Sequence, residues 1–124
     1  MKLLITGSRS LQERRDDLLI FMKHTLDNFF ESYPDGVIYD GGAEGPDTWA
    51  HQYCQWKGKK DIQIYPDYRH LGKNAPLIRD KQLVDEVDMI YAFWDCESTG
   101  TAYTFNYALD SGKPVSIFKF PKAD

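Results

Sequence analysis

The chain has 124 residues, of which 42% are hydrophobic and 27% charged, and its formal net charge is −4. These values are typical of one globular domain that is large enough to bury a core. The acidic balance and the absence of a long basic run argue against non-specific nucleic-acid binding.

The sequence contains no strong pattern of a metal site, a disulfide or a membrane-spanning segment. Cys54 and Cys96 have no zinc-type spacing, and the three histidines are scattered. We therefore expect neither a metal site nor a bound cofactor. The apolar run at the start is too short for a signal peptide, and no stretch is long enough to span a membrane, so the expected compartment is the cytoplasm.

Short apolar runs alternate with amphipathic stretches in the first half of the chain. Residues 3–5 form a run typical of a buried strand, and residues 18–30 carry an apolar stripe at helical spacing. After a turn at 34–36, residues 37–39 predict a second strand. Pro46 suits the first turn of a helix that ends near residues 57–58.

The second half repeats this alternation. Strands are predicted at residues 62–65, 89–93 and 115–118, helices at about 76–85 and 101–111, and a polar loop at 66–74. The whole pattern predicts an α/β fold, a Rossmann-like three-layer sandwich around a five-stranded, mainly parallel sheet. Residues 1–124 are expected to form one such domain.

Glycine occurs in three of the four predicted strand-to-helix loops, at Gly7, Gly41–Gly42 and Gly100. In a parallel sheet these loops share the carboxyl edge, where ligands bind at the point at which the strand order reverses. Glycine lets the backbone approach a ligand, and the following helix N-terminus offers N–H groups to an anion. We expect the loops to converge on one nucleotide- or phosphate-type site.

The first two loops offer different chemistry. Gly7, Ser8 and Arg9 suit a phosphate, with Arg9 binding it bidentately, although a solvated arginine on a tight turn has the same pattern. The second loop lacks the lysine and hydroxyl of a Walker motif, and its acids, Glu44 and Asp47, suit ribose hydroxyls better than phosphate. Asp47 is equally suited to capping its helix.

The third loop runs from residue 95 to residue 101. Ser98, Gly100 and Thr101 can present hydroxyl and N–H groups to an anion, and simple helix capping would use the same donors. Trp49 and Trp94 flank the expected site. A nucleobase could stack on either ring, but we expect both in or near the core.

Several segments, taken in chain order, resemble a known family. They are residues 5–9, 40–47 with Ala50, 72–76 with 78–80, 92–95 and 98–101. The series resembles the YspA-like branch of the SLOG superfamily, which is named after DNA-processing protein A and the Lonely Guy cytokinin-activating enzymes. The resemblance extends from residue 3 to about residue 118 and implies a Rossmann-like fold with a nucleotide-derived ligand.

The resemblance also identifies a departure. In Lonely Guy enzymes the glycine–threonine loop holds a phosphate, a glutamate three residues after the threonine is catalytic, and an arginine on the preceding helix assists. Arg79 matches that arginine, whereas Thr104 stands in place of the glutamate. An enzyme of this kind would need another acid, for which the loops offer Glu44, Asp47, Asp95 and Glu97.

The expected function is binding, for sensing or processing, of a nucleotide-derived small molecule. Phosphate would lie against residues 7–9 and 98–101 with Arg79 as countercharge, and ribose would lie near Gly42 and Asp47. One alternative is a phosphoribohydrolase or N-glycosidase acting on a nucleoside monophosphate. The other is single-stranded DNA binding, which the acidic charge disfavours. The aromatic-rich helices and the resemblance suggest a homodimer or higher oligomer.

Overall fold

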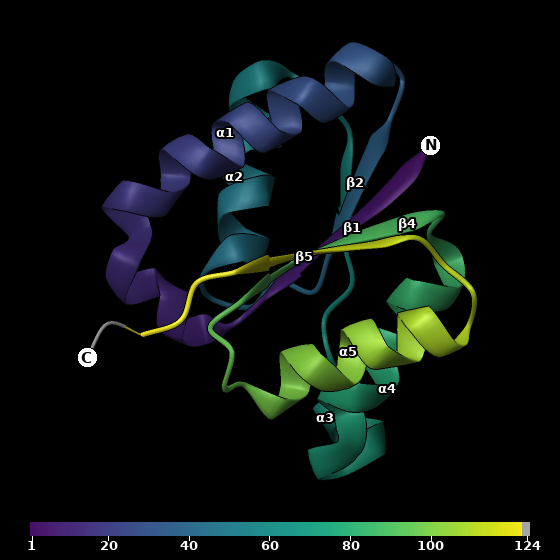
Figure 1. The fold of residues 1–124 in the computed structure, drawn as a ribbon. Coiled ribbons are helices and arrows are strands. Elements are labelled where there is room, and N and C mark those ends of the chain that lie inside the picture. Colours follow the sequence, from purple (N-terminus) through teal and green to yellow (C-terminus); the bar gives the residue numbers. More distant parts are fainter. Residues whose placement is uncertain (123–124) are drawn as a thin grey trace.

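The computed structural model describes residues 1–122 and contains one five-stranded sheet (Figure 1). The strands are β1 (Lys2–Gly7), β2 (Val37–Asp40), β3 (Asp61–Gln63), β4 (Met89–Trp94) and β5 (Val115–Lys119). Their order across the sheet is β3-β2-β1-β4-β5, and every neighbouring pair is parallel. The predicted α/β class and its mainly parallel sheet are confirmed.

Helices cover both faces of the sheet, which completes the three layers. They are α1 (Arg15–Ser32), α2 (Pro46–Lys57), α3 (Tyr68–Leu71), α4 (Ala75–Glu86) and α5 (Thr99–Asp110). Helices α1 and α2 lie on one face, and α4 and α5 lie on the other (Figure 1).

Successive side chains of a strand point to opposite faces of the sheet, which explains why both faces are apolar. Leu3 and Ile5 pack against the stripe of α1 and against α2, whereas Leu4, between them, packs against α4 and α5. The stripe of α1 is buried as its spacing predicts, with Met22 and Leu26 at most 1% exposed.

The strand order reverses at the centre of the sheet. β1 pairs with β2 on one side and with β4 on the other. The chain leaves β1 towards α1 on one face and leaves β4 towards α5 on the opposite face. The two connections therefore separate above the carboxyl ends of β1 and β4, where a crevice for ligands is expected.

Three segments differ from prediction. The third strand covers residues 61–63 rather than 62–65, because the chain leaves the sheet after the Ile64 N–H bonds the Asp40 carbonyl at 2.9 Å, and Pro66 has no N–H to continue the ladder. The predicted loop at 66–74 contains α3, whose N-cap Asp67 accepts the His70 N–H. A 3-10 helix, η1 (Arg9–Arg14), precedes α1 and was not predicted.

None of the helices described for residues 1–122 is both long and apolar enough to cross a membrane.

Candidate functional site

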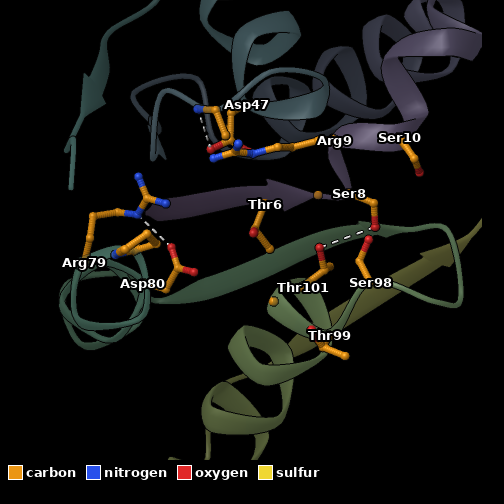
Figure 2. A pocket seen from close by; sticks show the side chains of 14 residues that line it. Thr6, Ser8, Arg9, Ser10, Asp47, Arg79, Asp80, Ser98, Thr99 and Thr101 are labelled. Atoms are coloured by element: carbon orange, nitrogen blue, oxygen red, sulfur yellow. Dashed lines mark hydrogen bonds and ion pairs between the residues drawn. The ribbon is translucent and has the colours of Figure 1, made fainter. Parts of the chain in front are cut away.

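A cavity of about 370 Å³ opens at the carboxyl edge of the sheet, above β1 and β4. Its lining consists of residues 6–10, 98–101, Ala43 with Asp47, and Pro76 with Arg79 and Asp80. Figure 2 shows Arg79 and Asp80 at one end and Ser8, Ser10 and Ser98 at the other. The first and third glycine loops meet here, as the positions of the strands predict.

The first turn of α5 supplies donors to the cavity. No hydrogen bond among residues 1–122 uses the N–H groups of Thr99, Gly100 or Thr101. The Thr101 hydroxyl lies 3.4 Å from that of Ser8, and both side chains are buried. Ser98 occupies the N-cap position, but its side chain does not cap the helix. These unpaired donors and the helix dipole favour an anion.

Asp95 organises the loop before α5 instead of lining the cavity. Its carboxylate accepts hydrogen bonds from the Ser10 and Ser98 hydroxyls and from the N–H groups of Glu97 and Ser98. Burial alone would raise the pKa of Asp95, but the hydrogen bonds from Ser10, Ser98 and Glu97 together hold it well below its usual range. This carboxylate is a structural acceptor with no proton to donate near neutral pH.

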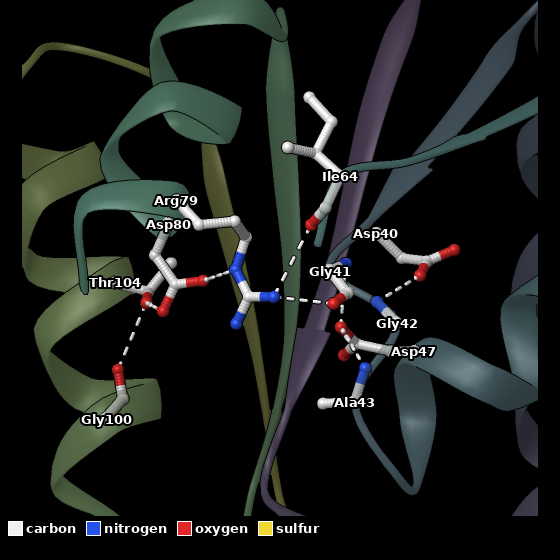
Figure 3. Close-up of polar contacts among 10 residues, drawn as sticks. All are labelled: Asp40, Gly41, Gly42, Ala43, Asp47, Ile64, Arg79, Asp80, Gly100 and Thr104. Atoms are coloured by element: carbon white, nitrogen blue, oxygen red, sulfur yellow. Dashed lines mark hydrogen bonds and ion pairs between the residues drawn. The ribbon is translucent and has the colours of Figure 1, made fainter. Parts of the chain in front are cut away.

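Asp47 folds the second glycine loop around its own side chain. Its Oδ2 accepts the Gly41 N–H at 2.8 Å and the Ala43 N–H at 3.5 Å, while Asp40 accepts the Gly42 N–H at 2.7 Å (Figure 3). Asp47 thus bonds to the backbone of the loop and does not cap α2. Hydrogen bonds among the described residues use only Oδ2, which leaves Oδ1 to a ligand.

Asp47 also has an unusual protonation equilibrium. Burial first, and then the charge of Asp40, raise the pKa of Asp47 to about 7. The Gly41 N–H, Arg79 and the Ala43 N–H oppose that rise. A cavity-lining carboxyl with such a pKa can exchange a proton near neutrality, which is a property of general acids and bases.

Gly41 and Gly42 lie outside the cavity lining, and packing explains why both are glycine. A Cβ on Gly41 would lie 2.6 Å from the Arg79 guanidinium, and one on Gly42 would lie 2.3 Å from the Tyr65 ring. Gly7 does line the cavity, but a Cβ there would lie 2.4 Å from the Pro46 side chain. Gly100 differs, because a Cβ there meets no atom within 4 Å.

Arg79 both lines the cavity and supports its wall. It is 7% exposed, its Nη1 donates to the Gly41 carbonyl at 2.5 Å and to the Ile64 carbonyl at 3.4 Å, and its Nε donates to Asp80 at 2.7 Å (Figure 3). Only Nη2 has no partner among residues 1–122. Arg79 therefore faces the cavity and also forms an ion pair with Asp80.

Thr104 is buried and lies next to a carboxylate from another helix. Its hydroxyl is 3.0 Å from Asp80 Oδ2 and 3.1 Å from the Gly100 carbonyl. Thr104, which stands where the resemblance implies a glutamate, thus contacts Asp80 of α4.

The remaining expected residues lie at the rim or away from the cavity. Arg9 is exposed, and its side chain points towards Asp47 (Figure 2). Glu44 and Glu97 are exposed outside the lining, Glu97 with Lys122 at 3.3 Å. Trp49 is buried and Trp94 half-buried, and neither lines the cavity.

The lining also contains residues that sequence reasoning did not select, namely Thr6, Ser10, Ala43, Pro76 and Asp80. Thr6 and Ser10 adjoin selected loop residues, so loop position alone could have indicated them. Asp80 belongs to the segment 78–80 of the resemblance, which assigns it no role. Its contact with Thr104 depends on how α4 and α5 pack, which no local pattern reveals.

No family model matches the chain, and no curated protein matches it. Among solved structures, the fold is similar to DNA processing protein A (DprA) from Streptococcus pneumoniae, with a TM-score of 0.71 and 19% identity over 98% of this chain and 50% of DprA. It is also similar to TM1055, with a TM-score of 0.68 and 19% identity over 92% of this chain and 71% of that protein. The chain spans half the length of DprA.

These identities are low, so the two likenesses bear on the fold. The relation to the SLOG superfamily and to its YspA-like branch, which rests on the motifs, stays a prediction. In its fold, this chain is a Rossmann-like α/β protein similar to DprA and TM1055.

Proposed function

We propose that the cavity binds a phosphorylated, nucleotide-derived small molecule. The observation that carries this proposal is the set of unpaired N–H groups of Thr99, Gly100 and Thr101, which face one cavity together with the buried hydroxyls of Ser8 and Thr101. A phosphate there accepts several hydrogen bonds at once and meets the positive end of the α5 dipole. The volume of about 370 Å³ lies in the range of small-ligand sites.

The charged residues favour one orientation of such a ligand. Arg79 is engaged with Asp80 and two carbonyls, so the main anion-binding groups are the first turn of α5 and the neighbouring hydroxyls. The ionised carboxyl groups of Asp47 and Asp80 accept hydroxyl donors and offer a phosphate no donor. Phosphate therefore lies by α5, and the sugar lies towards Asp47 and Asp80.

A panel of nucleotides tests the proposal by equilibrium unfolding. A ligand that binds only the folded protein stabilises it by ~2.7 kcal/mol at a hundredfold excess over its Kd. We expect this stabilisation for at least one nucleoside monophosphate or sugar nucleotide, and a weaker effect for inorganic phosphate. No stabilisation by any phosphorylated compound would overturn the proposal.

The variant Gly100→Ala distinguishes an effect on ligand affinity from an effect on the stability of the fold. Because the added methyl meets no protein atom and alanine favours a helix more than glycine does, the variant should be about 0.5–1 kcal/mol more stable. The same methyl stands beside N–H groups assigned to phosphate, so we expect affinity to fall about tenfold. Gly112→Ala, outside the lining at a positive φ of 77°, should instead lose stability and keep the affinity. Equal affinities for Gly100→Ala and the parent protein would contradict the phosphate position.

A second candidate function follows from Asp47, which lines the cavity, whose Oδ1 has no hydrogen-bond partner among residues 1–122, and whose pKa is raised to about 7. Such a group suits hydrolysis of the N-glycosidic bond of a nucleoside monophosphate. Water would bond to C1′, the C1′–N bond would break, and Asp47 would give its proton to the departing base, leaving ribose 5-phosphate. The carboxylate would regain a proton from the attacking water.

Chromatography of free base tests this second function. We expect base release by the parent protein and a loss of about 100-fold or more in Asp47→Asn, which keeps the loop acceptor but has no acidic proton. Glu44→Gln, in the same loop but exposed and outside the cavity lining, is the control and should retain the activity. Undiminished release by Asp47→Asn would exclude Asp47 as the acid.

A further inference from the structure

Asp80 is a carboxylate of the cavity at the end where the proposed function places the sugar. It lies on α4, its side chain is 18% exposed, and it is at the end of the cavity away from Ser8 and Ser98 (Figure 2). It is thus partly shielded from water and still open to a ligand. A carboxylate in such a place contributes to which ligand the cavity accepts.

Both oxygens of Asp80 are held in place by neighbours. Oδ1 accepts Arg79 Nε at 2.7 Å, and Oδ2 accepts the Thr104 hydroxyl at 3.0 Å (Figure 3). These are the partners of Asp80 among residues 1–122. Because an ionised carboxylate accepts about four hydrogen bonds, each oxygen keeps capacity for one more donor.

The charge around Asp80 determines the kind of donor. Arg79 already neutralises Asp80, so the pair does not require a second cation. A phosphate oxygen is itself an acceptor, so it cannot bond to the two oxygens of Asp80. The group that fits is neutral and donates two hydrogen bonds to two adjacent acceptors, which describes neighbouring hydroxyls on a sugar.

We infer that Asp80 binds a pair of neighbouring ligand hydroxyls and makes the cavity select a phosphorylated ribose over its 2-deoxy counterpart. This inference rests on the proposed binding of a phosphorylated ligand. The phosphate lies on the first turn of α5, and the hydroxyl pair lies on the carboxylate that Arg79 and Thr104 orient. Asp80 is then the residue that determines the sugar.

Calorimetric titration with ribose 5-phosphate, 2-deoxyribose 5-phosphate and inorganic phosphate tests the inference. The parent protein should bind ribose 5-phosphate about tenfold or more tightly than the deoxy sugar, because the deoxy ligand leaves a charged acceptor without its donor. In Asp80→Asn the preference should shrink to about threefold or less. Inorganic phosphate should bind this variant at least as tightly as the parent, because a negative charge has been removed.

Two further variants test whether a changed sugar preference comes from Asp80 itself and not from a loss of the fold. Asp85→Asn lies on the same helix, is exposed and outside the lining, and should keep the full preference. Thr104→Val retains the carboxylate but removes one of its two partners, so the preference should fall only in part. Unfolding curves confirm that each titrated variant is folded.

The outcomes distinguish the inference from the proposal on which it rests. Equal binding of the two sugar phosphates by the parent, with phosphate still bound, overturns the role of Asp80 alone. A preference that persists unchanged in folded Asp80→Asn overturns it as well. Failure of all three ligands to bind overturns the phosphate site and this inference together.

Discussion

Replacing Arg79 with methionine is expected to lower the free energy of unfolding by about 3 kcal/mol, near the lower end of the range for breaking a buried ion pair. The change leaves the Gly41 and Ile64 carbonyls without their donor and Asp80 without its cation. Methionine fills much of the same volume, so the loss reports polar contacts more than a cavity. Because Arg79 is 7% exposed, water replaces few of these contacts.

Urea unfolding followed by circular dichroism measures this loss, and an exposed arginine provides the control. Arg69 on α3 has no hydrogen bond or ion pair with residues 1–122, so Arg69→Met should change stability by less than about 0.5 kcal/mol. An unchanged urea midpoint for Arg79→Met would show that the guanidinium does not hold the loops together.

A double-mutant cycle with Asp80 separates the contribution of the Arg79–Asp80 ion pair from that of the other hydrogen bonds of Arg79. In Arg79→Met alone, Asp80 loses its cation and stays partly buried. Adding Asp80→Asn removes that charge, so the double variant should recover about 1–2 kcal/mol relative to additive losses. Strict additivity would indicate that Arg79 acts only through the Gly41 and Ile64 carbonyls.

Much of the fold follows from local patterns that tertiary packing reinforces. The apolar run at residues 3–5 and the stripe on α1 were predictable because burial on one face and helical spacing leave direct marks on the sequence. The end of β3 was not, since Ile64 and Tyr65 have strong strand propensity. Here the Arg79 side chain bonds the Ile64 carbonyl, and the Tyr65 ring packs over Gly42. Both contacts come from elsewhere in the chain.

The location of the cavity was predictable from topology, whereas the contacts of several residues were not. Loops after β1 and β4 meet at the reversal of strand order, so Ser8, Gly100 and Thr101 line one cavity. Gly41 and Gly42 illustrate the limit, because a glycine next to a buried guanidinium or ring looks the same in sequence as a glycine next to a phosphate. Only the packed structure separates these causes.

Asp47 is the residue for which we expect the largest effect of pH. Its pKa rises from 3.8 to about 7 in the folded protein, first through burial and then through the charge of Asp40. Below about pH 4 the carboxyl is protonated in both the folded and the unfolded chain. Between about pH 4 and pH 7 the folded state binds more protons, so stability falls as pH rises. The shift of about three pKa units corresponds to at most ~4 kcal/mol.

Asp47→Asn should therefore be about 2 kcal/mol more stable than the parent protein at pH 8, roughly half of the upper value because an amide reproduces a protonated carboxyl imperfectly. Its side-chain oxygen can still accept the Gly41 N–H. At pH 4, where the carboxyl of the parent is protonated, the advantage should vanish.

Urea unfolding from pH 4 to pH 9 checks both the sign and the range. Burial raises the pKa of Asp40 to about 6. In Asp47→Asn the decline in stability with rising pH should therefore be confined to pH values below about 6, where Asp40 titrates. Asp35→Asn, exposed in the turn before β2, should follow the parent curve. A variant less stable than the parent at pH 8 would mean that the charged Asp47 supports the loop through the Gly41 and Ala43 N–H groups more than burial penalises it. Asp47 would then be a fixed anion of the cavity wall, and the proton it would supply to a departing base would have to come from another group.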